Sequence, residues 1–280
     1  MNGSHKRDLA DIPAGGHSPL DFVITKATEG VIGMVQEAIA YNQTLLAFQP
    51  VLSSTNNGQT GFYEGLIRVL DPTGRVIPAA EFMNRIEDTE TGREIDVLAL
   101  RHGLRTLQRN RDLRLSINMS ARSIGYRPWV NCLNRFLNDT PQLGERLILE
   151  ITESSAMLLP ELVIDFIARL QRKGICFALD QFGSGSLAIR YFRDFDFDIL
   201  KIDGQFIRGL AQNPDNQATV RALHAIAREF DMITVAEQVE TANDASLAAH
   251  IGIDYLQGYY FSAPTTQPDW LRDSEPRKQA

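Results

Sequence analysis

Short apolar segments alternate with helical segments over most of the chain, and this alternation restricts the possible folds more than any other feature. The predicted helices after the first strands are 80–86, 93–109, 129–138, 160–173, 216–230 and 242–250. The apolar strands between and after them are 113–118, 147–151, 176–180, 199–202, 233–237 and 255–261. Such alternation is typical of parallel strands joined by crossover helices.

The beginning of the chain has a different pattern. A helix is predicted over 29–42, followed by strands over 45–52 and 62–70. A turn signal at 56–58 separates the two strands, and a second turn signal follows them at 71–74. The two strands are therefore predicted to form an antiparallel pair at the edge of the parallel array.

Chain length and composition favour one α/β domain. A length of 280 residues suits a single (β/α) barrel, which typically has about 250. An open doubly wound sheet also fits the alternation, but no glycine-rich phosphate loop follows the first strand. We expect a flexible tail over 1–20, the folded domain over 21–270 and a polar tail over 271–280. No apolar run approaches the roughly 20 residues of a membrane span, which predicts a cytoplasmic protein without membrane contact.

Charge and metal-ligand composition exclude some functions. The net charge is -7 and there is no block rich in Lys or Arg, so nucleic-acid binding has little support. The two cysteines, Cys132 and Cys176, form no CxxC pair, and the five histidines show no spacing typical of a zinc site. An acidic protein can still bind an anionic phosphodiester when metal ions lie between them.

Six successive strands end in a polar or charged residue that an apolar core would reject. These residues are Asn118, Glu150, Asp180, Lys201, Glu237 and Gln257. A single such residue is usually a solvated turn or a helix cap. Six in succession favour a shared site, because the carboxyl ends of the strands of a barrel meet at one rim. Glu64, inside the strand predicted over 62–70, adds another carboxylate.

The composition of this set narrows the chemistry. It offers oxygen ligands without His or Cys, which suits Mg²⁺, Mn²⁺ or Ca²⁺. Crowded carboxylates repel one another and need cations to remain ionised. Together with Lys201, such a set suits phosphodiester hydrolysis, whereas covalent acyl chemistry has no Ser-His-Asp or Cys-His support. An unrelated metal-dependent barrel hydrolase is also compatible with these residues alone.

Eight motifs, in this order, resemble those of EAL domains. They are Phe48-Gln49-Pro50, Glu64-Gly65-Leu66-Ile67-Arg68, Ser116-Ile117-Asn118, Glu150-Ile151-Thr152-Glu153, Asp180-Gln181-Phe182-Gly183, Leu200-Lys201-Ile202-Asp203, Ala236-Glu237-Gln238-Val239-Glu240 and Gln257-Gly258-Tyr259. The resemblance extends over residues 42–264. It implies a modified TIM-type (β/α)8 barrel with one antiparallel strand. It also implies a bacterial cyclic di-GMP phosphodiesterase that forms linear pGpG with Mg²⁺ or Mn²⁺.

The resemblance also implies roles for individual residues. The first metal would be held by Glu64, Asn118, Glu150 and Asp180, and the second by Asp180 and Glu237. Lys201 and Gln257 would position the attacking water, with Glu237 in the catalytic group. Gln49 and Arg68 would bind the ligand, and Glu153 would stabilise the loop after Asp180.

Two departures from the family pattern bear on activity. Gln181 stands where the family has a second aspartate, which predicts a weakened second metal site. Ser186, Leu187 and Ala188 stand where a Tyr and two Ser are usual. An active phosphodiesterase and a non-catalytic cyclic di-GMP receptor acting through a protein partner both remain open, as does a homodimer formed through the barrel rim.

Overall fold

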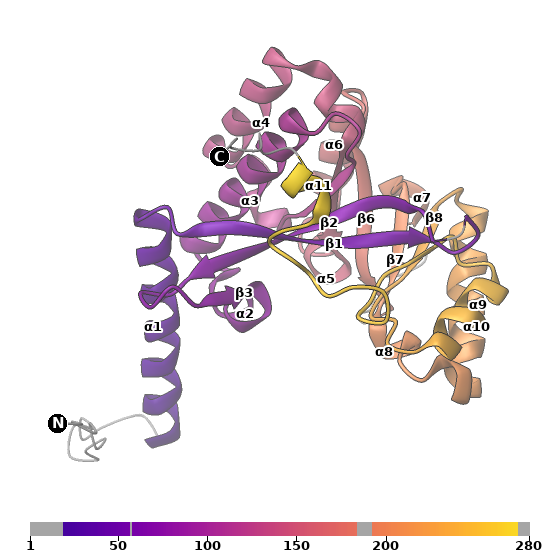
Figure 1. The fold of residues 1–280 in the computed structure, drawn as a ribbon. Coiled ribbons are helices and arrows are strands. Elements are labelled where there is room, and N and C mark those ends of the chain that lie inside the picture. The colour runs from indigo at the N-terminus through magenta and orange to yellow at the C-terminus, as the bar shows by residue number, and fades with distance from the viewer. Residues whose placement is uncertain (1–18, 57, 184–191, 274–280) are drawn as a thin grey trace, which may run out of the picture.

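Eight strands of one mixed sheet close into a barrel (Figure 1). The computed structural model describes residues 19–56, 58–183 and 192–273. The strand order is β1-β9-β8-β7-β6-β5-β4-β2, and pairing of β2 with β1 completes the barrel, while β3 extends the sheet outside β2. The strands are β1 (Thr44–Ser53), β2 (Thr60–Leu70), β3 (Val76–Pro78), β4 (Leu115–Asn118), β5 (Leu147–Thr152), β6 (Cys176–Phe182), β7 (Ile199–Ile202), β8 (Ile233–Ala236) and β9 (Tyr255–Leu256). The predicted fold class is confirmed.

Helices connect the strands and cover the outside of the barrel (Figure 1). They are α1 (Pro19–Ala40), α2 (Met83–Ile86), α3 (Glu90–Arg109), α4 (Arg127–Asp139), α5 (Glu153–Ala156), α6 (Pro160–Gln171), α7 (Phe192–Phe195), α8 (Gly204–Ile207), α9 (Pro214–Glu229), α10 (Ala242–Ile251) and α11 (Asp269–Asp273). Short 3₁₀ helices are η2 (Ala79–Glu81), η3 (Ala121–Ser123), η4 (Pro141–Arg146) and η6 (Leu210–Gln212). Within the described ranges, none of the helices combines the length and the apolar character that a membrane span requires.

Local sequence sets where several of these helices begin and end. The side chain of Asn213 accepts hydrogen bonds from the N–H groups of Asp215 and Asn216, and a proline follows it at the first position of α9. The side chain of Thr241 caps α10 in the same way, by accepting from the N–H of Asp244. Gly252, with φ 109°, ends α10 in the left-handed conformation that glycine adopts without strain.

Strand β1 is the antiparallel member of the barrel. It pairs antiparallel with β2, from Thr44 opposite Val69 to Leu52 opposite Thr60, and antiparallel with β9. The other barrel pairs, from β2–β4 round to β8–β9, are parallel. The early hairpin is therefore confirmed, and its turn is closed by a hydrogen bond from the N–H of Gln59 to the carbonyl of Asn56. Asn57 lies outside the described residues.

Two layers of side chains fill the barrel interior. The lower layer is an apolar cluster of Val51, Phe62, Ile148, Ala178, Ile199 and Val235. Residues two positions apart on a strand point to the same face. The step from Phe62 to Glu64, or from Ile199 to Lys201, therefore leads from the apolar layer to a polar layer at the carboxyl ends. This alternation explains how buried charges can lie directly above a packed core.

A second core lies between the sheet and the surrounding helices. Trp129 of α4 packs on Phe166 of α6 with ring centroids 5.6 Å apart, and Phe166 meets Phe177 of β6 at 5.8 Å. All three side chains are almost fully buried. Burial of each such side chain stabilises the fold by about 1.5–3 kcal/mol. This packing fixes β6, and with it the position of Asp180.

Two predicted boundaries differ most from the structure. Helix α1 begins at Pro19 rather than at 29, and proline suits the first position of a helix. Strand β9 ends at Leu256 rather than at 261, because the chain turns at Gly258. A Cβ on Gly258 would lie 2.1 Å from the carbonyl oxygen of Val239, so only glycine permits this turn. The predicted tail over 1–20 lies almost wholly outside the described residues.

Candidate functional site

The polar strand ends meet at one rim of the barrel, as the sequence pattern predicts. Asn118 ends β4, Glu150 and Asp180 lie near the ends of β5 and β6, and Lys201 lies in β7. Glu237 and Gln257 follow directly after β8 and β9. Glu64 reaches the same rim from β2 and Gln49 from the neighbouring β1, where the two residues are opposite each other. We call these eight residues the rim cluster.

The ammonium group of Lys201 lies at the centre of the rim cluster. Its Nζ is 2.7 Å from Glu150 Oε2, 3.0 Å from Glu237 Oε1, 3.1 Å from Glu64 Oε2 and 3.4 Å from Asp180 Oδ1. The Lys201 side chain is fully buried, and each carboxylate side chain is at most 13% exposed. Four carboxylates around one ammonium, if all are ionised, carry a net charge of -3. The site is therefore short of positive charge.

Amide side chains complete the rim cluster on the side of Glu64. Asn118 Nδ2 donates to Glu64 Oε1 at 2.8 Å, and Gln257 Nε2 donates to Glu64 Oε2 at 2.7 Å. Gln257 Nε2 also lies 3.2 Å from Gln49 Oε1, and Gln49 Nε2 donates to the carbonyl of Ser262 at 3.0 Å. These contacts hold Glu64 ionised, because a carboxylate that accepts several hydrogen bonds is stabilised in its charged form.

The shortage of positive charge changes the pKa values of the groups in the rim cluster. Burial and the charge of Glu64 raise the pKa of Glu150 to about 8. Burial and neighbouring carboxylates also raise the pKa of Asp180 and Glu237. Burial alone would raise the pKa of Glu64 too, but Lys201, Gln257 and Asn118 together lower it. Burial alone would lower the pKa of Lys201, but the four carboxylates raise it well above its usual value.

The donor atoms of the rim cluster fit a hard divalent cation. Buried polar atoms without a hydrogen-bond partner in the described part of the chain include Glu150 Oε1, Gln257 Oε1 and Ser116 Oγ, which lie in barrel strands or directly after one. Buried orphan acceptors of this kind indicate a missing ion or water. In this arrangement the described Asp, Glu, His and Cys side chains form no ready metal-ligand set, since the four carboxylates turn toward Lys201. The oxygen donors nevertheless match the preference of Mg²⁺ and Mn²⁺.

Gln181 lies beside Asp180 in an unusual backbone conformation. Its φ is 55°, its side chain is exposed, and the pairing of β6 with β7 is irregular between Leu179 and Phe182. Positive φ is uncommon outside glycine, and Asn and Asp tolerate it better than most residues. The backbone therefore accepts an aspartate at this position. The departures at Ser186, Leu187 and Ala188 lie outside the described residues.

Glu153 holds the beginning of the segment that follows β6. It is 2% exposed at the first position of α5, and its Oε2 accepts a hydrogen bond from the N–H of Gly183 at 2.9 Å. Gly183 has φ 94°, so the chain turns there in the left-handed conformation. Glu153 therefore connects α5 to the beginning of this segment, and its loop-stabilising role stays a prediction.

Arg68 lies on the inner side of β2, four residues after Glu64, and is partly buried. Its Nη1 donates to the carbonyl of Ile67 at 3.0 Å. Burial lowers the pKa of Arg68, while the nearby Tyr259 and Glu64 raise it, and the guanidinium stays charged. Tyr259 is 71% exposed and was given no role by the sequence pattern. Its place next to glycine in the Gln257-Gly258-Tyr259 motif was the only signal that could have found it.

For cyclic di-GMP, the ligand that the motif resemblance implies, we expect Arg68→Ala to weaken binding by about 1.5–3 kcal/mol, the usual contribution of a hydrogen bond to a charged group. Isothermal titration calorimetry with Ca²⁺ in place of Mg²⁺ would measure binding without turnover. Arg75→Ala is the control, because Arg75 is largely exposed and forms an ion pair with Asp71 in the turn after β2. Unchanged affinity of the Arg68 variant would remove Arg68 from the ligand site.

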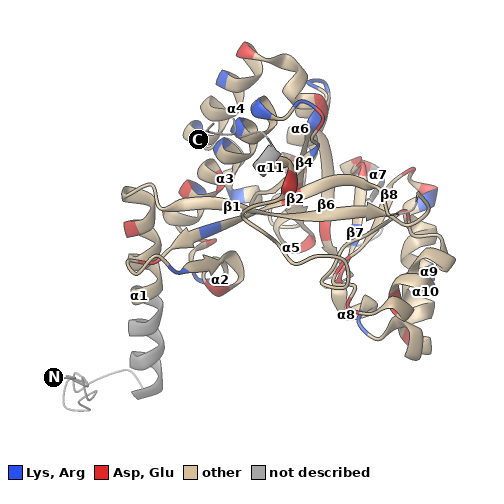
Figure 2. Ribbon diagram, viewed as in Figure 1, with Lys and Arg blue, Asp and Glu red and all other residues tan. Residues whose placement is uncertain are grey.

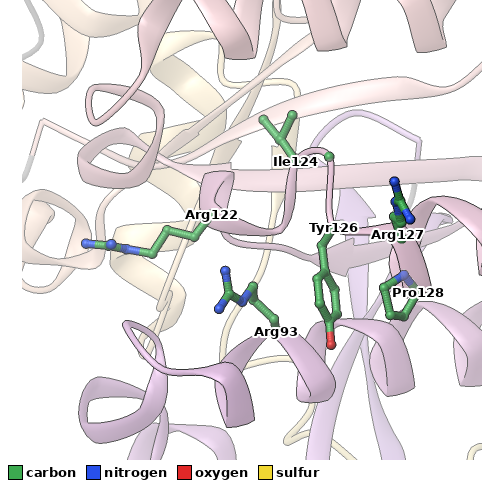
Figure 3. Close-up of a pocket in the computed structure, with 7 residues that line it drawn as sticks. Arg93, Arg122, Ile124, Tyr126, Arg127 and Pro128 are labelled. Carbon is green, nitrogen blue, oxygen red and sulfur yellow. The ribbon is translucent and has the colours of Figure 1, made fainter.

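A surface pocket away from the rim cluster has a different lining. It has a volume of about 510 Å³ and is bordered by Arg93, Arg122, Tyr126 and Arg127 (Figure 3). Two of its arginines are already neutralised, Arg93 by Glu90 at 2.6 Å and Arg122 by Asp88 at 2.7 Å. No residue of the rim cluster lines it. Lys and Arg residues also occur elsewhere on α3 and α4 (Figure 2).

The fold and the rim cluster define a (β/α)-type barrel with a polar site at the carboxyl ends of its strands, in which the candidate metal ligands are oxygen atoms. The family model of the EAL domain matches residues 32–264. The chain belongs to the EAL domain family. This result confirms the family that the eight motifs predict.

Curated relatives and solved structures agree with this family. A cyclic di-GMP phosphodiesterase of Shewanella oneidensis, PdeB, is 31% identical over 87% of this chain and 29% of its own length. The Escherichia coli cyclic di-GMP phosphodiesterase PdeF is 28% identical over 89% of this chain and 34% of its own length. The chain therefore spans about a third of the length of these relatives. The PaMucR phosphodiesterase in complex with cyclic di-GMP has a TM-score of 0.74 at 28% identity, covering 84% of this chain and 97% of that one. The FimX EAL domain from Pseudomonas aeruginosa bound to cyclic di-GMP has a TM-score of 0.76 at 27% identity, covering 84% of this chain and 96% of that one.

Proposed function

We propose that this chain hydrolyses cyclic di-GMP to linear pGpG with the help of Mg²⁺ or Mn²⁺. The observation that carries the proposal is the buried set of four carboxylates that share a single ammonium group. Such a set binds a substrate phosphodiester only if cations neutralise it. The names of the relatives support the same substrate.

Glu64, Asn118, Glu150 and Asp180 would hold the first metal, and Asp180 and Glu237 the second. A bound divalent ion would supply Lewis-acid stabilisation of the phosphodiester and an acidified water. The protein's own contribution is orientation. Lys201 and Gln257 both contact Glu64 and would orient the attacking water, while Arg68 would hold a phosphate or a guanine edge by a forked hydrogen bond.

Metal binding would change the contacts of Lys201. The ammonium group of Lys201 provides the positive charge to which all four carboxylates turn. With a divalent ion bound, these carboxylates would share a second cation, and Lys201 would make fewer carboxylate contacts. Its N–H groups would then be available to a water or to a phosphate oxygen.

The direct test is to incubate the protein with cyclic di-GMP and Mn²⁺ and to separate the products by chromatography. Formation of pGpG that stops in excess EDTA is the expected result. Tight binding of cyclic di-GMP without any pGpG at saturating Mn²⁺ would instead assign the chain to the receptor class.

A homodimer and a protein partner are further proposals. Measurements of molecular size with and without cyclic di-GMP would test them.

We expect Gln181→Asp to raise turnover in Mg²⁺ by about tenfold or more, since about 1.4 kcal/mol of transition-state stabilisation gives a factor of ten. The substitution adds a carboxylate beside Asp180, and the left-handed backbone at this position suits aspartate. Turnover should be measured for both proteins over a series of Mg²⁺ and Mn²⁺ concentrations. Affinity for cyclic di-GMP should change much less, because Gln49 and Arg68 are untouched.

Gln181→Asn is the matched control, because it has the size of the aspartate without its charge. The prediction is contradicted if wild-type turnover is already rapid at low Mg²⁺ and Gln181→Asp does not raise it. The Gln181 amide would then be an adequate replacement for the aspartate of the family. If Gln181→Asn and Gln181→Asp raise turnover equally, the effect comes from a better backbone fit and not from the added charge.

A further inference from the structure

Asp96 is a buried carboxylate on α3 that faces the segment after β4. It is 4% exposed. Its Oδ2 accepts a hydrogen bond from the N–H of Ser120 at 3.0 Å and another from the hydroxyl of Ser123 at 2.6 Å. Within the described ranges no Lys, Arg or His forms an ion pair with it. It is therefore a buried acid with two neutral donors and no cation.

A buried carboxylate of this kind contributes little to the stability of a fold. A buried carboxylate without a cation is strongly disfavoured, and an apolar side chain of similar size in the same place is often more stabilising. Burial raises the pKa of Asp96 to about 7, although the hydrogen bonds from Ser123 and Ser120 lower it. We therefore expect the role of Asp96 to lie in the segment to which it is hydrogen-bonded, the residues after β4.

That segment carries the backbone immediately after Asn118. Three consecutive N–H groups are held by three different elements. The N–H of Met119 donates to the carbonyl of Glu150 at 2.9 Å, that of Ser120 to Asp96, and that of Ala121 to Ser155 Oγ at 2.8 Å. Strand β5, helix α3 and helix α5 thus fix the direction in which β4 ends.

The same ties connect successive loops of the rim. Ser155 belongs to α5, whose first residue, Glu153, accepts from the N–H of Gly183 in the segment after β6. The loops that follow β4, β5 and β6 therefore form one hydrogen-bonded series behind Asn118, Glu150 and Asp180. Asp96 is the member of this series that attaches it to α3, a 20-residue helix packed on the barrel.

We infer that Asp96 is a positioning residue for the metal site, which holds Asn118 in ligating orientation by fixing the backbone of Ser120 and the side chain of Ser123. The inference rests on the proposed function, because it assumes that Asn118 is a ligand. Asp96 itself is not among the proposed metal or substrate ligands, and its hydrogen bonds go to Ser120 and Ser123. Groups that orient direct ligands typically change metal affinity by 10- to 100-fold when they are removed.

The test is Mn²⁺ affinity, measured by electron paramagnetic resonance on the full chain without cyclic di-GMP. We expect Asp96→Leu to raise the Kd for Mn²⁺ by about tenfold or more. Asp96→Asn keeps an acceptor oxygen for both donors, so it should leave the Kd within about twofold of wild type. This rescue by the conservative variant separates positioning from a general effect of charge.

Asp244 provides a matched control. It is 2% exposed and accepts from the N–H of Ala211 at 2.8 Å and from the hydroxyl of Thr241 at 2.7 Å, which is the same chemistry away from the rim cluster. Asp244→Leu should leave the Kd for Mn²⁺ unchanged, whatever its effect on thermal stability. If Asp96→Leu does not fold, Ser123→Ala removes one donor and should raise the Kd by about threefold to tenfold.

The outcomes distinguish this inference from the proposed function. Wild-type Mn²⁺ affinity in Asp96→Leu, or in Ser123→Ala where the first variant does not fold, would overturn the positioning role and leave the metal site intact. An equal loss of affinity in Asp244→Leu would also overturn it. A wild-type protein that binds no Mn²⁺ would overturn both proposals.

Discussion

Lys201→Met should lower the free energy of unfolding of the metal-free protein by about 3–5 kcal/mol, the usual effect of removing one partner of a buried ion pair. Lys201 is fully buried and is the cation to which all four rim carboxylates turn. Methionine fills a similar volume, so the loss reflects charge rather than a cavity. The result should lie near the lower end of the range, because the carboxylates can take up protons.

The effect should depend on pH in a direction that the structure fixes. The pKa of Glu150 is raised to about 8 in the folded protein, above its usual value of 4.5. A carboxyl group of this kind contributes stability that is fully present below its unfolded pKa and is lost as the pH rises through its folded pKa. Without the positive charge of Lys201, the pKa values of the four carboxyl groups would rise further. The variant should therefore lose less stability at pH 5.5 than at pH 8.

Urea denaturation in EDTA at both pH values would measure these differences. Lys173→Met is the control, because Lys173 is exposed and its ammonium group donates to the side chain of Asn134 at 3.0 Å, away from the rim cluster. Addition of Mn²⁺ should stabilise Lys201→Met more than wild type, since a divalent ion replaces the missing charge. An identical loss at pH 5.5 and pH 8 would show that packing, and not the carboxylate cluster, determines the effect.

Glu150→Ala should reduce Mn²⁺ affinity and turnover by at least about a hundredfold, since even outer groups around a metal contribute 10- to 100-fold. Glu150 has no exposed surface, one oxygen 2.7 Å from Lys201 Nζ and the other without a hydrogen-bond partner among the described residues. It therefore offers a free ligand atom inside the cluster. The fold should survive, because Leu149 and Ile151 keep β5 packed.

Circular dichroism and thermal unfolding would establish that the Glu150 variant is folded before its Mn²⁺ affinity and pGpG formation are measured. Asp244→Ala is the matched control, since Asp244 is nearly as buried but lies outside the rim cluster. The control should retain turnover. A folded Glu150→Ala protein with wild-type Mn²⁺ affinity would remove Glu150 from the proposed ligands.

Much of the fold was predictable because its signals are local. Polar residues at the ends of apolar strands identify a barrel rim within a few positions, and a turn signal between 52 and 62 identifies the β1–β2 hairpin. The end of β9 was not predictable in this way. It depends on the approach of Gly258 to Val239, a contact between segments that no local pattern describes.

The candidate site residues could be identified from the sequence, because residue type and alternation along a strand are properties of neighbouring positions. How these residues interact depends on the folded barrel. Lys201 and Glu64 are 137 residues apart, and Gln257 and Glu64 are 193 apart, yet both pairs are in hydrogen-bond contact. Asp96 lies in an amphipathic helix with nothing local to distinguish it from a solvated acid. Closure of the barrel brings distant strand ends together in a buried site, where charges interact strongly. This determines which carboxylates share the ammonium group of Lys201 and which serine donors Asp96 holds.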